Sequence, residues 1–270
     1  MQRGATLSDR QGGQVMDEML REVLVYQRDH HIDGSVYKAC QCDFAYNSNH
    51  IEGSTLTHDQ TVQIFDRETF SGTARVDDIV ETRNHFSAFD RILDTWDTPL
   101  DADYLCALHR TLKEGTMDAK DPIMAVGSFK RFSNVIGGAV GDVETASPED
   151  VPALVDALVG EYESREPHAM DDIVRFHWGL ESIHPFSDGN GRVGRLVMFK
   201  ECLRAGITPF IITEDLRAFY IRGLREYEKT PGYLDDTCGY AQDRFEASYM
   251  PMARGFAAAL KDAEGPMGLE

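Results

Sequence analysis

The chain has 270 residues, of which 42% are hydrophobic, so it can bury the core of one large domain or of two ordinary ones. Its 46 acidic residues outnumber 27 basic ones, which gives a formal net charge of -19 at pH 7. Such a charge repels phosphate backbones and anionic lipid surfaces. We therefore expect neither nucleic acid nor a membrane as the main partner.

The cysteine content and the apolar pattern indicate a subcellular location. Five cysteines are scattered along the chain, an odd number that predicts free thiols in a reducing compartment. The sequence has no apolar run of 18 residues and no apolar segment of the signal-peptide type near its start. A cytoplasmic protein is expected.

The predicted elements are helices over almost the whole chain. Residues 1–14 are rich in Gly, Gln and charge and predict a flexible arm, residues 15–263 predict a single domain, and residues 264–270 predict a tail. Within the domain, apolar residues at helical spacing predict ten helices. These cover residues 15–30, 34–52, 57–65, 77–95, 101–114, 148–163, 170–183, 191–205, 215–229 and 237–263.

Residues at the ends of three of these helices support their boundaries. Thr57 precedes one helix as an N-cap, and Gly206 follows another as a C-cap. Ser147-Pro148 predicts a helix that begins with proline at its first position.

The segment between Ile123 and Val143 departs from the helical pattern. Its glycines and its alternating Val, Phe and Ile residues predict a short β-hairpin. The fold class expected from the sequence is therefore all-α with one small β-hairpin.

The segment from Ile183 to Arg195 concentrates unlike chemical groups between two predicted helices. Gly189, Asn190 and Gly191 can adopt positive backbone dihedrals that direct successive N–H groups into one concavity. The N-terminus of the next helix adds the positive end of its dipole. The segment predicts an anion cradle suited to phosphates.

Charged and titratable side chains flank this cradle. Arg192 and Arg195 share one face of the helix and can reach oxygens further along a polyphosphate. Asp188 is anionic, and a carboxylate among phosphates is explained by a bridging Mg²⁺. His184 has an ordinary pKa of ~6.5 and can accept a proton from an incoming hydroxyl. Singly these are common structural or turn residues, but their ordered combination favours a site that handles phosphates.

The string from His184 to Arg195 resembles the signature of the Fic family, His-x-Phe-x-Asp/Glu-Gly-Asn-Gly-Arg-x-x-Arg, at every defined position. The resemblance implies a helical core over residues 103–205 with a β-hairpin flap, followed by C-terminal helices over residues 207–263. It also implies transfer of AMP from Mg-ATP to a Ser, Thr or Tyr hydroxyl of a protein. The implied roles are general base for His184, core anchor for Phe186, Mg²⁺ ligand for Asp188, and phosphate binding for Gly189, Asn190, Gly191, Arg192 and Arg195.

The predicted hairpin resembles the flap of short bacterial members of the family. The resemblance is carried by Gly127, Phe129, Lys130 and Asn134, and it implies that the flap holds the target segment as an added strand. The alternative is a surface hairpin whose aromatic residues only pack.

Residues 40–53 predict a helix whose end resembles the inhibitory motif of the family, Ser/Thr-x-x-x-Glu-Gly/Asn. Ser48, Glu52 and Gly53 fit this motif, which lies before the catalytic core as in the second of the three classes. Glu52 is expected to form a bidentate bond with Arg195 and to exclude productive ATP. The alternative is an ordinary helix end closed by Gly53.

Other activities remain open from the sequence. Glu52 could position water for removal of AMP from a modified target, or the chain could be an inactive nucleotide-binding interaction module. UMP or GMP could replace AMP, and Tyr220 and Tyr240 are candidates for the nucleobase pocket. A divalent-metal hydrolase site is a further alternative, with ligands His177, Glu181, His184 and Asp188.

The partner predicted by the resemblance is a protein that offers a hydroxyl side chain. The chain itself is one such target, so auto-modification is an expectation. A homodimer is also open, because some related proteins regulate the inhibitory motif by self-association.

Overall fold

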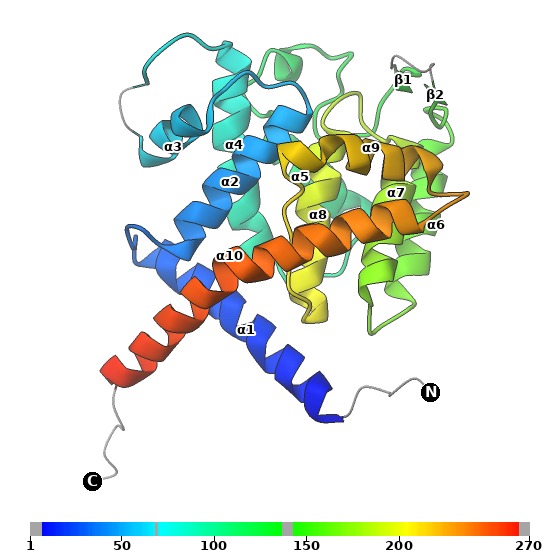
Figure 1. Cartoon of the computed structure of the whole chain (residues 1–270). Helices are drawn as coiled ribbons and strands as arrows, with labels where there is room; N and C mark the ends of the chain where they lie inside the picture. The colour runs from blue at the N-terminus through cyan, green and yellow to red at the C-terminus, as the bar shows by residue number, and fades with distance from the viewer. Residues whose placement is uncertain (1–6, 68–69, 137–142, 265–270) are drawn as a thin grey trace.

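The structure, a computed structural model, describes residues 7–67, 70–136 and 143–264. Over these residues the chain is all-α apart from two short strands (Figure 1). The helices are α1 (Leu7–Asp29), α2 (Val36–Ile51), α3 (His58–Asp66), α4 (Val76–Asp94), α5 (Ala102–Lys113), η1 (Asp118–Lys120), α6 (Val151–Glu163), α7 (Met170–Ile183), α8 (Asn190–Ala205), η2 (Glu214–Leu216), α9 (Arg217–Glu226) and α10 (Gly232–Glu264).

Capping residues end several helices where the sequence predicts. Thr57 is the N-cap of α3 and forms a capping box with Gln60. Gly206 ends α8 in the left-handed conformation, with a φ of 65°. The boundaries of α7 match the predicted residues 170–183.

Several predicted boundaries are wrong, among them the starts of α1, of α6, and of α10, which begins at Gly232 and not at residue 237. Helix α1 begins at Leu7, eight residues before the predicted start at residue 15. Gly12 and Gly13 favour a loop, at about 1 kcal/mol each relative to alanine, but extension of a helix that is already formed adds one hydrogen bond per residue and offsets part of that cost. Helix α6 begins at Val151, because the N–H groups of Asp150 and Val151 bond Ser147 O in a turn that precedes it.

The predicted hairpin is much shorter in the described residues than residues 123–143. Strand β1 (Val135–Ile136) pairs with β2 (Val143–Glu144) in antiparallel register, and residues 137–142 lie outside the described residues. Residues 123–134 form turns, because Ala125 and Gly127 have φ values of 49° and 77° that extended strands do not allow. A flap therefore remains a prediction.

Helix α8 lies at the centre of the molecule, where residues 190–203 are all buried (Figure 1). Three aromatic rings hold α2, α4 and α8 together: Phe44 lies 5.4 Å from Phe199, and Phe89 lies 5.2 Å from Phe199, between ring centroids. Burial of each ring contributes about 1.5–3 kcal/mol. This packing brings the end of α2 against the beginning of α8.

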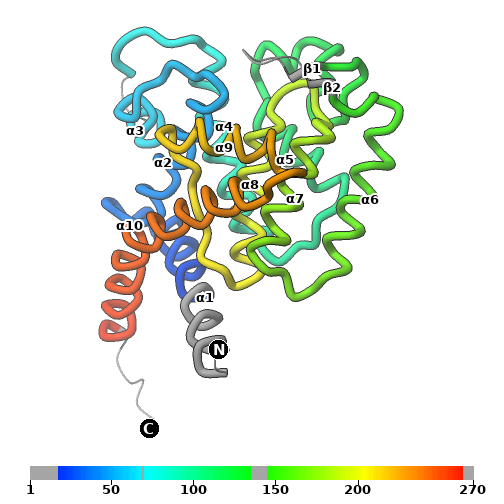
Figure 2. The backbone as a smooth tube through the Cα atoms, turned by 45° about the vertical axis from the view of Figure 1, so that its right-hand side comes forward, coloured from blue at the N-terminus to red at the C-terminus, as the bar shows by residue number. Residues whose placement is uncertain are grey.

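The last two helices and the first helix complete the packing. Helix α9 packs on α10, and α1 contacts both α2 and α10 (Figure 2). Within the described part of the chain, no helix combines the length and the apolar character needed to span a lipid bilayer.

Candidate active site

His184 directly follows α7 and turns the chain out of the helix. Its φ of 53° is left-handed, and its backbone N–H still donates to Leu180 O at 2.9 Å. Burial and then the charge of Lys130 lower the pKa of its half-buried side chain. The imidazole is therefore neutral near pH 7, which is the form that accepts a proton.

The loop after His184 is closed by the side chain of Asn190. Its Oδ1 accepts the Phe186 N–H at 2.8 Å, and its Nδ2 donates to Phe186 O at 2.9 Å. Both side chains are buried, Phe186 as the predicted core anchor. The sequence predicted Asn190 at the phosphates, but its amide is used to fix the loop.

The predicted anion cradle lies at the beginning of α8 and is lined by glycine. Of the three residues expected to adopt positive dihedrals only Gly189 does, as the N-cap with a φ of 83° that favours glycine, because Asn190 and Gly191 already form the first turn of α8. A Cβ on Gly191 would lie 2.2 Å from Glu52 Oε1, so the carboxylate of Glu52 rests directly on the first turn of α8. A negative group is favoured there by the helix dipole.

Arg195 is buried, and α2 supplies most of its partners. Its NH2 donates to Glu52 Oε1 at 2.7 Å and to Ser48 O at 2.9 Å, and its Nε donates to Ser48 Oγ at 3.0 Å. The predicted residues thus meet, but the contact with Glu52 is a single charged hydrogen bond. The bidentate geometry expected from the sequence does not form, because Ser48 takes the Nε donor.

Arg192 lies one turn earlier on α8 and bonds different carboxylates. Its NH2 contacts Asp188 Oδ2 at 2.8 Å, and its NH1 contacts Glu81 Oε2 at 2.6 Å. These two arginines share a helix face as predicted, but the carboxylates that neutralise them come from separate parts of the chain.

Lys113 is the main charged residue of the site that the sequence did not predict. Its ammonium, only 2% exposed, binds Glu81, Asp118 at 2.6 Å and Asp188 at 2.6 Å. These contacts and Arg192 hold the pKa of Asp188 well below its ordinary value despite burial. Nothing in the sequence near Lys113 marked it, since its partners come from α4, η1 and the loop before α8.

The predicted Mg²⁺ ligand Asp188 faces a cleft of about 390 Å³. Most of the charged side chains that line this cleft are acidic, namely Glu52, Asp77, Asp78, Glu81, Asp118 and Asp188 against Arg75, Lys113 and Arg192. Oxygen ligands of this kind suit a hard divalent cation. Glu81, Asp118 and Asp188 bring ligand-type oxygen atoms within 4.8 Å of one another, but Lys113 bonds all three carboxylates and Arg192 also bonds Asp188, so a metal ion would have to displace or share these contacts.

The predicted flap residues contact the catalytic loop, which is the segment from His184 to Gly189 that carries the predicted base. Lys130 is buried, its N–H donates to Pro185 O at 2.8 Å, and its ammonium bonds Asn134 Oδ1 at 2.7 Å. Asn134 in turn donates to Phe186 O at 3.1 Å. Phe129 lies 5.9 Å from Phe186 between ring centroids.

Gly127 and His109 also lie beside the catalytic loop. The Gly127 N–H donates to His109 Nδ1 at 3.1 Å, and His109 Nε2 lies 3.0 Å from Asp188 O. Burial lowers the pKa of His109 to about 4, so the ring is neutral at physiological pH.

The alternative metal-hydrolase site does not form. His177 Nε2 bonds the Tyr220 hydroxyl at 2.7 Å, and among the described residues His177, Glu181, His184 and Asp188 are not a group whose ligand atoms lie within 4.8 Å of one another. Tyr220 is itself buried beside Arg195, which excludes it from the nucleobase pocket predicted for it. Tyr240 is 55% exposed on α10.

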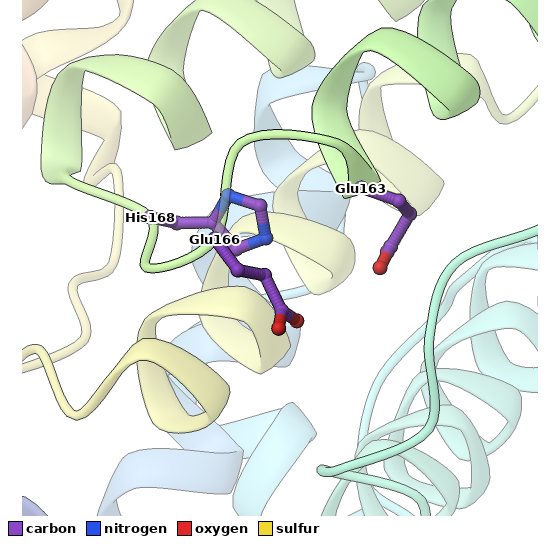
Figure 3. A group of neighbouring side chains, drawn as sticks. All are labelled: Glu163, Glu166 and His168. Carbon is purple, nitrogen blue, oxygen red and sulfur yellow. The ribbon is translucent and has the colours of Figure 1, made fainter.

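Among the described residues, Glu163, Glu166 and His168 also bring ligand-type atoms within 4.8 Å of one another. Figure 3 shows them where α6 ends and the chain turns toward α7. The guanidinium of Arg204 already bonds both carboxylates, including both oxygens of Glu163 at 2.7 Å. Arg204 thus supplies the positive charge that a metal would bring.

Comparison with known proteins agrees with the fold and identifies the family. Residues 99–202 match the Fic/DOC family. The chain is 32% identical over 191 residues to protein adenylyltransferase Fic of Drosophila willistoni, which covers 67% of this chain and 35% of that protein. The Drosophila melanogaster protein of the same name is 28% identical over 225 residues, or 78% of this chain and 44% of that protein. The chain spans between about a third and a half of the length of these relatives.

Solved structures show the same fold. A Fic domain containing signaling protein from Bacteroides thetaiotaomicron superposes with a TM-score of 0.76 at 24% identity, covering 91% of this chain and 96% of that one. A Fic family protein from Desulfovibrio desulfuricans gives 0.65 at 22% identity, over 95% of this chain and 77% of that one.

Proposed function

Because this chain is a Fic/DOC family protein, distantly homologous to protein adenylyltransferases, we propose that it transfers AMP from Mg-ATP to a hydroxyl side chain of a protein. The observation that carries the proposal is His184, a base kept neutral by burial at the end of α7 and joined by a short loop to the Gly189 N-cap of α8. A base beside an anion-binding helix N-terminus suits attack on a phosphate.

In the proposed reaction, His184 removes the proton of the target hydroxyl as the oxygen attacks the α-phosphorus of ATP. The bond from the α-phosphorus to its bridging oxygen breaks, and pyrophosphate leaves. Arg192 and Arg195 neutralise the outer phosphates, while the amides of Gly189 and Gly191 face the inner ones. Mg²⁺ bound through Asp188 would offset the phosphate charge within an acidic cleft.

We further propose that Glu52 inhibits this transfer. Its carboxylate lies against Gly191 and bonds Arg195. It therefore occupies the position where a phosphate would bind and pairs with the arginine that the phosphate would use. Competition between two anions for one guanidinium lowers the population of productively bound ATP. Ser48 supports the same state through its two contacts with Arg195.

The remaining parts of the proposal follow from the resemblance. A flap near Gly127–Asn134 would hold the target segment, and auto-modification would give a target without a second protein. AMP removal by the same site is the second candidate, because Glu52 lies at the cradle where it could orient water.

The test is incubation of wild type, Glu52→Gly and His184→Ala with α-³²P-ATP and Mg²⁺, with and without cell lysate. We expect label on protein, more of it with Glu52→Gly, and none with His184→Ala. A matched incubation with γ-³²P-ATP separates AMP transfer from phosphorylation. Label that is independent of His184 would refute the assigned base, and its complete absence would refute the transferase.

A further inference from the structure

His109 lies on α5 with its ring only 1% exposed and both nitrogens engaged. On one side Nε2 lies 3.0 Å from the backbone carbonyl of Asp188, within the catalytic loop. On the other side Nδ1 accepts the backbone N–H of Gly127, in the segment that leads to the predicted flap, at 3.1 Å. The ring therefore bridges two segments that are distant in sequence.

The partners determine which nitrogen carries the proton. A carbonyl oxygen only accepts, so Nε2 must carry a hydrogen, and a backbone N–H only donates, so Nδ1 must present its lone pair. This gives one neutral tautomer that satisfies both contacts. No other side chain offers a donor and an acceptor with this separation on a flat ring.

Each of the two backbone segments carries a glycine with a left-handed φ at or next to its contact with the ring. Gly127 has a φ of 77°, and a Cβ there would lie 2.5 Å from Arg110 Nε. A Cβ on Gly189, directly after Asp188, would lie 3.5 Å from His109 Cδ2. Phe186 stacks on the imidazole with its centroid 4.1 Å away and an interplanar angle of 17°.

We infer that His109 is a positioning residue that fixes the segment entering the predicted flap to the catalytic loop, by one hydrogen bond on each side of its ring. The target segment and the loop that carries His184 and Asp188 would then keep one relative position. A misplacement of about 1 Å between reacting groups can cost ~100-fold in rate. Only the kinetic part of this inference rests on the proposed transferase.

Three substitutions separate positioning from simple packing. His109→Phe keeps an aromatic ring against Phe186 and loses both hydrogen bonds. His109→Asn keeps an acceptor near Nδ1, and His109→Gln keeps a donor near Nε2. If the ring only packs, the Phe variant is the most active of the three; if it positions, that variant is the least active, by about 10-fold or more.

Transfer is measured as kcat and KM for ATP and for a protein target, in wild-type and Glu52→Gly backgrounds, after thermal melting confirms folding. We expect loss in kcat and a rise in KM for the target, with partial rescue by Asn or Gln. A Phe variant equal to wild type would overturn the inference.

Amide hydrogen exchange gives a readout that needs no activity. In His109→Phe, peptides covering residues 125–130 and 186–190 should exchange about 10-fold faster, while α10 is unchanged. Unchanged exchange in both peptides would overturn the inference. If no variant transfers AMP, including wild type, the proposed function fails while exchange still decides the role of His109.

Discussion

Arg192 and Arg195 lie one turn apart on α8, and the protein neutralises them in different ways. Arg192 shares Asp188 and Glu81 with Lys113 in a cluster of alternating charges. Arg195 instead receives Glu52 and Ser48 from α2, more than a hundred residues earlier in the chain.

In the proposed function, the contacts of Arg192 belong to the fixed structure of the site, whereas the contacts of Arg195 regulate it. Removing a carboxylate of the Arg192 cluster leaves the buried Lys113 or Arg192 with less compensating charge, so substitutions in that cluster are costly. Glu52 is a third exposed and belongs to another helix, so it can leave Arg195 without disturbing α8. The following predictions test this contrast, beginning with the largest effect.

Lys113→Met should lower the free energy of unfolding by about 3 kcal/mol. The substitution removes the shared ammonium and leaves three carboxylates around one apolar side chain. Chemical denaturation measures the effect, and Lys229→Met at an exposed position is the control, expected to change stability by less than ~0.5 kcal/mol. Equal stability of the two variants would show that Arg192 alone balances the cluster.

Glu181→Gln should stabilise the protein above pH 6 and remove a pH dependence. Burial and then the charge of Glu52 raise the pKa of Glu181 to about 8. A raised folded pKa favours folding below the unfolded value of ~4.3, and this contribution is lost as pH rises toward 8. The gap between variant and wild type should therefore widen from pH 5 to pH 8, to about 4–5 kcal/mol.

The measurement is unfolding in denaturant at pH 5, 6, 7 and 8. Glu228→Gln, on the surface, is the matched control and should show no widening gap. A constant difference between Glu181→Gln and wild type across this range would contradict the prediction.

Glu52→Gln should raise transfer about 5-fold, less than Glu52→Gly. Glutamine keeps an acceptor oxygen for Arg195 but loses the charge, and a charged hydrogen bond is roughly twice as strong as a neutral one. A loss of about 1 kcal/mol corresponds to that change. Initial rates with α-³²P-ATP measure it; a Gln variant as slow as wild type would mean that shape and not charge excludes ATP.

The turn from His184 to the start of α8 and the burial of Phe186 can be predicted from the sequence because they depend on local chemistry. Turn glycines, the buried Phe186 and arginines at helical spacing depend on neighbours within twelve residues. The contact of Glu52 with Arg195 was reached only through the family motif, since no local rule joins α2 to α8.

The site residues that the sequence did not predict depend on contacts between segments that are far apart in the chain. Lys113 and His109 lie on α5 among apolar residues, and their partners come from other helices and loops. Asn190 could equally face a ligand or its own loop, and only the folded loop decides. Ala125, a non-glycine residue with positive φ, could not be foreseen, so alternating apolar residues were read as a strand.

Ser48→Ala should have the smallest effect, a rise in transfer of about 2–4-fold. The variant removes the hydroxyl that accepts from Arg195 Nε at 3.0 Å but retains the backbone carbonyl that accepts from NH2. One buried hydrogen bond contributes about 0.5–1.5 kcal/mol, and its loss frees Arg195 only partly. Ser182→Ala is the control, because that exposed hydroxyl bonds only its own helix at Trp178 O. If Ser48→Ala instead raised transfer as much as Glu52→Gly does, the Ser48 hydroxyl rather than the Glu52 carboxylate would hold Arg195. The contrast between the two arginines would then depend on α2 as a whole.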